Sequence, residues 1–233
     1  MTGEDLRDWP NVTLAEARDA ADALGWTAEV ERRVALDRLD AMRGHPPPAA
    51  SLDDYARTVI DAMAGLQDPV IVSQSYGAFT ATLVAAQFPV RLLVLLAGMI
   101  PAPGESPGDW WGNTGYQQAV EKQAELDGGQ TGNDDPFISF YNGVPRPLAE
   151  EALRRGGRGE SSVVWNTRWP LDAWPDVPTK FILCKDDQFF PAAFMGRQAH
   201  QRLGAVADEV PGCHCAALSH PRELGDLLVS YLA

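Results

Sequence analysis

The sequence has few cysteines and no long hydrophobic run. It holds three cysteines in 233 residues, and Cys213 and Cys215 are too close together for an ordinary disulfide framework. The longest apolar runs, around Ile71 and Leu95, are far shorter than the ~20 residues that span a bilayer. Residues 4–8 are mostly charged, where a signal peptide would be apolar. We therefore expect a cytoplasmic protein that does not bind a membrane.

Basic residues are scarce as well. Nineteen lysines and arginines against 32 aspartates and glutamates give a formal net charge of −13. Such an acidic chain repels the phosphates of nucleic acids and anionic membrane surfaces, so we expect no nucleic-acid partner. The hydrophobic content of 45% is enough to bury a sizeable core. The length and composition therefore predict one domain over residues 1–233.

Motifs for cofactors and metals are also missing. The sequence has no glycine-rich phosphate loop with its lysine and no dinucleotide fingerprint. Cys213, His214 and Cys215 could suggest a metal, but they have no distant partner pair at the usual zinc spacing. We therefore expect neither a cofactor nor a metal.

The most informative stretch is residues 69–79, in which a β-branched apolar run is followed by a small-x-Ser-x-Gly turn and a helical segment. The pattern predicts a buried strand, a tight turn with Ser75 at its apex, and a helix. It is typical of a nucleophile elbow, in which small residues flank a strained serine. Ser73 stands where glycine is usual, but it is small. The simpler alternative is an ordinary turn with an N-capping serine.

Further strands and helices alternate along the rest of the chain. The run 91–96 predicts a strand buried on both faces, as parallel strands between helical layers are. We expect an α/β fold, with a mostly parallel sheet flanked by helices. The other predicted strands cover residues 179–184 and 208–210, and the predicted helices cover residues 52–64, 78–88, 192–203 and 221–232.

Two segments do not follow this alternation. Residues 1–48 show charged helical patterns and no strand, and end in a proline-rich linker. Residues 101–178 also lack a clear strand and mix turns with helical patterns at 116–126 and 148–155. We therefore expect an atypical N-terminal segment and a helical cap inserted between two core strands.

Three residues follow strands in the order Ser75, Asp187, His214, which is the chain order of triads in α/β-hydrolases. A serine hydroxyl needs an imidazole to take its proton and a carboxylate to orient that imidazole. His214 alone among four histidines follows a strand in a loop. Asp186 and Asp187 both follow residues 179–184, and we favour Asp187. The backbone N–H of Tyr76 would be an oxyanion donor.

Substrate contacts are expected next to the serine and in the cap. We assign them to Gln74, Trp110 and Trp111, because binding sites are lined mainly by apolar and aromatic groups. Tryptophans in a cap also commonly pack in its own core.

From residue 51 onward the chain resembles the α/β-hydrolase superfamily, and in particular small bacterial esterase-like members akin to the plant methylesterase and hydroxynitrile lyase group. The matching stretches are residues 72–79, 92–103, 184–191 and 211–218. The resemblance implies a triad of Ser75, Asp187 and His214, because the fourth position of the acid turn carries the carboxylate. Family members begin with a strand and a loop that supplies a second oxyanion N–H, and residues 1–48 do not match that unit.

These observations predict a serine hydrolase of a small carboxylic ester. Because a second oxyanion donor is not recognised in the sequence, we expect slow turnover. We also expect a homo-oligomer, because an uncovered sheet edge favours association. A small-molecule binding protein that retains the triad, and a lyase, are the alternatives.

Overall fold

The computed structural model describes residues 50–156 and 162–232. The predicted N-terminal segment, residues 1–48, lies outside this part of the chain. The described residues form one sheet of four parallel strands in the order β1-β2-β3-β4. The strands are β1 (Val70–Gln74), β2 (Leu92–Leu96), β3 (Thr179–Cys184) and β4 (Asp208–Val210). A parallel sheet with helical connections is the predicted fold class, which is confirmed.

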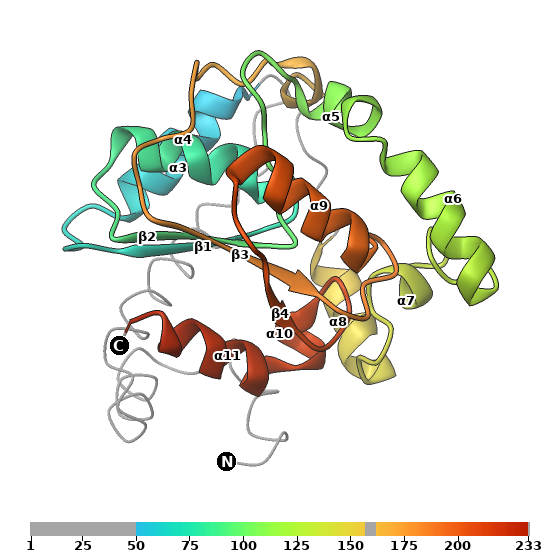
Figure 1. Ribbon diagram of the computed structural model, residues 1–233. Coiled ribbons are helices and arrows are strands. Elements are labelled where there is room, and N and C mark those ends of the chain that lie inside the picture. The colour runs from blue at the N-terminus through green and yellow to red at the C-terminus, as the bar shows by residue number, and fades with distance from the viewer. Residues whose placement is uncertain (1–49, 157–161, 233) are drawn as a thin grey trace, which may run out of the picture.

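Helices cover both faces of this sheet. Helices α3, α4 and α9 lie on one face and α11 lies on the other (Figure 1). The predicted helices are present, and most of their bounds agree within two residues. The flanking helices are α3 (Leu52–Ala62), α4 (Gly77–Gln87), α9 (Ala192–Leu203), α10 (Ala216–Ser219) and α11 (Pro221–Ser230). None of the described helices is long and apolar enough to cross a membrane.

The core is centred on β2, in which all five residues are buried. Each leucine or valine side chain that is fully buried contributes about 1.5–3 kcal/mol. Strand β1 differs from the sequence prediction of a buried strand, because Val70 and Ile71 are only partly buried and Val72 is 40% exposed. Within the described residues β1 is an edge strand paired only with β2, which explains its lower burial.

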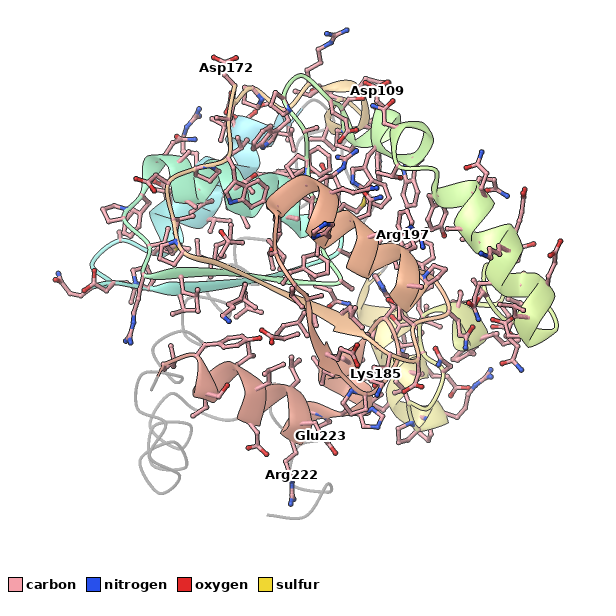
Figure 2. All side chains as sticks on the ribbon, viewed as in Figure 1. Asp109, Asp172, Lys185, Arg197, Arg222 and Glu223 are labelled. Atoms are coloured by element: carbon pink, nitrogen blue, oxygen red, sulfur yellow. The ribbon has the colours of Figure 1, made fainter. Side chains whose placement is uncertain are left out.

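Charged side chains lie mainly on the outside of this core. In Figure 2 Asp172 and Arg222 point outward from opposite sides of the molecule. The described fold therefore has exposed charges around an apolar interior.

The insertion between β2 and β3 is helical and contains no strand among its described residues. It begins with a capping box in which the Ser106 hydroxyl accepts from the Asp109 N–H, with Pro107 at the first helical position. The helices α5–α8 lie together on one side of the molecule (Figure 1). The insertion comprises α5 (Pro107–Asn113), α6 (Tyr116–Asp127), α7 (Pro136–Ser139), α8 (Arg146–Gly156) and the 3-10 turn η2 (Val164–Asn166).

A buried ion pair joins the start of this cap to α9. The side chain of Glu105 is 4% exposed and that of Arg202 is 14% exposed. Arg202 Nη2 donates to Glu105 Oε1 at 2.9 Å, and Arg202 Nη1 donates to Glu105 Oε2 and to the Ile100 carbonyl. The Asn113 amide and the Ala102 N–H also donate to the carboxylate. The carboxylate therefore depends on several donors from different elements.

We expect Arg202→Met to lower the free energy of unfolding by about 3–5 kcal/mol, because it leaves the Glu105 carboxylate buried without its cation. The matched control is Arg57→Met, which breaks the exposed pair of Arg57 with Asp54 and should cost less than about 1 kcal/mol. Urea unfolding measures both values. Equal effects of the two substitutions would show that the buried pair does not stabilise the cap.

Candidate active site

Ser75 lies between β1 and α4 with a backbone φ of +53°, a left-handed conformation that non-glycine residues rarely adopt. Its N–H donates to the Leu96 carbonyl at 3.0 Å, and its carbonyl accepts from the Met99 N–H at 2.9 Å. Both bonds tie the turn to the end of β2. A strained serine at a strand-to-helix turn is the geometry of a nucleophile elbow.

The packing next to the turn is close at Gly98 and ordinary at Gly77. A Cβ added at Gly98 would lie 2.9 Å from the Leu95 Cβ and 3.3 Å from the Ala78 Cβ. Position 98 therefore needs glycine so that the turn after β2 can pack against α4. A Cβ at Gly77 would lie 3.7 Å from the Ser73 Cβ, which is ordinary contact, so serine at position 73 fits the elbow.

Asp187 and His214 come together at the carboxyl-terminal edge of the same sheet. Asp187 follows β3 and His214 follows β4, and His214 Nδ1 lies 2.8 Å from Asp187 Oδ2. The two side chains are 1% and 3% exposed, respectively. The other oxygen, Asp187 Oδ1, accepts from the N–H groups of Phe189 and Phe190, each at 2.8 Å. These bonds fix the carboxylate so that one oxygen faces the imidazole.

Asp186, the alternative acid in the sequence, has a different environment. Its Oδ2 accepts from the Gly212 N–H at 2.8 Å, and its own N–H donates to the Gly212 carbonyl at 3.0 Å. The Asn142 side chain donates to its carbonyl at 2.8 Å. Asp186 thus joins the loop after β3 to the loop that carries His214, while the imidazole is paired with Asp187.

Three phenylalanines surround the imidazole, and the sequence analysis did not assign them. The rings of Phe140, Phe189 and Phe190 lie nearly perpendicular to the His214 ring, with centroids 5.3, 5.1 and 5.1 Å away. Phe189 and Phe190 lie two and three residues after Asp187, and an Asp whose carboxylate bonds the N–H two residues later is a recurrent turn. That signal was available in the sequence. Phe140 comes from the cap, and no local pattern indicates its position.

The cap also bonds directly to both of these loops. The Tyr116 hydroxyl donates to the Phe189 carbonyl at 3.0 Å, and the Cys215 N–H donates to the Phe140 carbonyl at 3.3 Å. The Thr131 hydroxyl lies 2.7 Å from Gln188 Oε1. Burial and the nearby Asp187 charge raise the pKa of Tyr116, so it stays a neutral donor. The cap therefore supports the segment that holds the Asp–His pair.

The predicted substrate-contacting residues have different positions. Trp110 is fully buried, with its indole N–H donating to the Ile100 carbonyl at 3.1 Å, so it packs as a core residue. Trp111 is partly buried against Trp110 and Tyr116. The Gln74 amide donates to the His214 carbonyl at 2.6 Å. Their contact with substrate stays a prediction.

The Tyr76 side chain lies between the body of the protein and the cap. Its ring centroid is 6.0 Å from that of Phe79 in α4 and 5.0 Å from that of Trp165 in η2. The residue after the serine therefore contacts the cap through its side chain. Donation by its backbone N–H to an oxyanion stays a prediction.

The three cysteines lie near the Asp–His pair as free thiols. Burial is the main cause that raises the pKa of each, to about 12 for Cys215. They are therefore protonated near neutral pH and are poor nucleophiles. The described part of the chain contains no group of three or more His, Cys, Asp or Glu residues that could hold a metal ion.

Solved structures share this fold at low sequence identity. Polyneuridine aldehyde esterase matches with a TM-score of 0.56 and 17% identity, covering 79% of this chain and 81% of that one. A pyrethroid hydrolase from Sphingobium faniae matches with a TM-score of 0.56 and 18% identity, covering 86% and 91%. An extracellular alpha/beta-hydrolase from a Paenibacillus species matches with a TM-score of 0.55 and 18% identity, covering 78% and 80%.

The search of curated proteins found no significant match. The model of the alpha/beta hydrolase family matches residues 7–227. The matched range includes most of the N-terminal segment in which the sequence shows no family-like strand and loop. Because the match extends over nearly the whole sequence, the chain belongs to the alpha/beta hydrolase family.

Proposed function

We propose that the protein is a serine hydrolase that cleaves small carboxylic esters through an acyl-enzyme on Ser75. The observation that carries this proposal is the buried contact of 2.8 Å between His214 Nδ1 and Asp187 Oδ2. It is supported by the strained elbow that presents Ser75 at the same edge of the sheet. Family membership and the esterase and hydrolase neighbours make this reaction class the natural assignment.

The contact between Asp187 and His214 determines which ring nitrogen of His214 carries the proton. An ionised carboxylate only accepts hydrogen bonds, so Asp187 holds His214 in the tautomer with the proton on Nδ1. The other ring nitrogen, Nε2, then has a lone pair for the Ser75 hydroxyl proton. Asp187 also stabilises the imidazolium that forms when this proton arrives.

The reaction has two balanced halves. Ser75 Oγ attacks the ester carbonyl carbon while His214 takes its proton, and the carbonyl becomes an oxyanion that the Tyr76 N–H stabilises. Collapse of this intermediate breaks the bond to the alkoxy group, which leaves as an alcohol with the proton from His214. Water then attacks the acyl-enzyme by the same route, releasing the acid and restoring Ser75.

The surroundings of the pair favour neutral substrates. The imidazole is enclosed by the rings of Phe140, Phe189 and Phe190. Asp187 Oδ2 lies 2.8 Å from its Nδ1, and the Asp186 carboxylate is bonded to the N–H of Gly212, two residues before His214. An anionic substrate would meet negative charge and apolar surface there. We therefore assign uncharged, largely apolar esters.

The test is a panel of neutral and anionic esters of matched size. A pH-stat titration measures the acid that each ester releases. We expect hydrolysis of the neutral esters, at rates below those of ordinary esterases if a second oxyanion donor is missing. Preference for the anionic esters would contradict the substrate assignment. Saturable binding of neutral esters without any acid release would instead favour a non-catalytic binding protein.

A further inference from the structure

The side chain of Gln74 spans the gap between the elbow and the histidine loop. Gln74 is the last residue of β1 and directly precedes Ser75. Its Nε2 donates to the backbone carbonyl of His214 at 2.6 Å, across 140 positions in the sequence. One amide therefore connects the strand that ends at the proposed nucleophile with the residue proposed as its base.

A second contact of the same side chain strengthens this connection. The Gln74 side chain also interacts with the Cys215 thiol, and this interaction partly offsets the rise in the thiol pKa that burial causes. The Cys215 N–H is bonded to the Phe140 carbonyl of the cap at 3.3 Å. Gln74 thus contacts two successive residues of the histidine loop at a point where the cap also supports it.

The other bonds named above for Ser75 and for the His214 ring do not connect these two residues to each other. Ser75 is held on β2 through Leu96 and Met99, and the His214 ring is held on the loop after β3 through Asp187. Each set of bonds fixes one partner to its own neighbours. The Gln74 side chain connects the two, because it belongs to the strand that ends at Ser75 and donates to the His214 carbonyl.

We propose that Gln74 is a positioning residue that sets the separation between the Ser75 hydroxyl and the His214 imidazole. This inference rests on the proposed function for its kinetic consequence. It replaces substrate contact as the role of Gln74, because the amide nitrogen is already bonded to the protein itself.

The physical consequence of losing this amide is a shift of the loop. The His214 carbonyl would lose its donor in a residue that is 3% exposed, and an unsatisfied buried acceptor favours rearrangement toward another partner. A displacement of about 1 Å between catalytic groups can lower a rate by about 10²-fold. Because the Gln74 amide nitrogen is bonded within the protein, substrate binding should change little.

The test is Gln74→Met, which keeps the length of the side chain and removes the amide. The matched control is Gln117→Met, which removes an exposed amide on α6 that bonds Glu121. We expect kcat of Gln74→Met to fall by about 10- to 100-fold with KM within twofold, and the control to match the native chain. Gln74→Glu should lose at least as much, because an ionised carboxylate would face the His214 carbonyl.

A rise in KM with unchanged kcat would overturn the proposal and return Gln74 to substrate binding. Unchanged kcat and KM would overturn it as well. If the native chain hydrolyses no ester, the proposed function fails, and hydrogen exchange of the Gly212 and Cys215 amides then decides the positioning role. Faster exchange in Gln74→Met, by about tenfold over Gln117→Met, supports positioning, and equal exchange contradicts it.

Discussion

Ser75→Ala is expected to lower ester turnover by about 10⁶-fold, the scale seen when the nucleophile of a serine triad is removed. The physical reason is that the Ser75 hydroxyl at the apex of the elbow forms the acyl-enzyme, and the three nearby thiols are protonated because burial raises their pKa. Turnover is measured by acid release under saturating substrate.

The control for this prediction is the double variant Ser75→Ala/His214→Ala. Since nucleophile and base act as a unit, the second substitution should add little to the first. The thermal unfolding midpoint checks that Ser75→Ala remains folded. A loss below about tenfold would place the nucleophile elsewhere.

Asp187→Asn is expected to lower kcat by about 10⁴-fold, because an amide in place of the carboxylate favours the wrong tautomer of His214. The bonds from the N–H groups of Phe189 and Phe190 can still hold an amide oxygen, so the backbone should remain in place. Steady-state kinetics on the best neutral ester measures the change.

Asp186→Asn is the matched control for that substitution. Its Oδ2 accepts the Gly212 N–H, a role that an amide oxygen can also fill. We therefore expect less than a tenfold loss in kcat. The reverse ranking of the two variants would transfer the acid role to Asp186.

The regular elements of the described fold could be predicted because their signals are local. Helix α3 begins at residue 52 as predicted, after a capping box of Ser51 and Asp54, and the run of leucines and valine in β2 is buried throughout. The bounds of β3, α9 and β4 match the predicted ranges. In each case the hydrophobic period or a cap specifies the element without help from distant residues.

The short helices of the cap were not predicted, for two different reasons. Helix α5 had a readable signal, the capping box of Ser106 and Asp109 with Pro107 at its start. Helix α7 has only four residues, too few for a hydrophobic period to appear. Strand β1 is less buried than predicted because it has only one neighbouring strand among the described residues. An apolar run in the sequence does not show how many strands lie beside it.

The candidate site also has residues that local sequence indicates and contacts that only the fold reveals. Chain order and strand ends indicated His214 and left Asp186 and Asp187 as possible acids, and the family resemblance favoured Asp187. The structure places Asp187 Oδ2 2.8 Å from His214 Nδ1. The ring of Phe140 against His214, the role of Asp186 and the bond from Gln74 to the His214 carbonyl all join residues far apart in the sequence. Such contacts follow from how the loops meet, so they require the fold.

The proposed reaction depends most directly on Ser75 being the nucleophile. Reaction of the native chain with a fluorophosphonate, followed by peptide mapping, identifies the residue that attacks an electrophile at the active site. We predict a single adduct on Ser75, absent from Ser75→Ala and slower to form in Asp187→Asn. An adduct on another residue, or ester hydrolysis that continues at the native rate in Ser75→Ala, would contradict it.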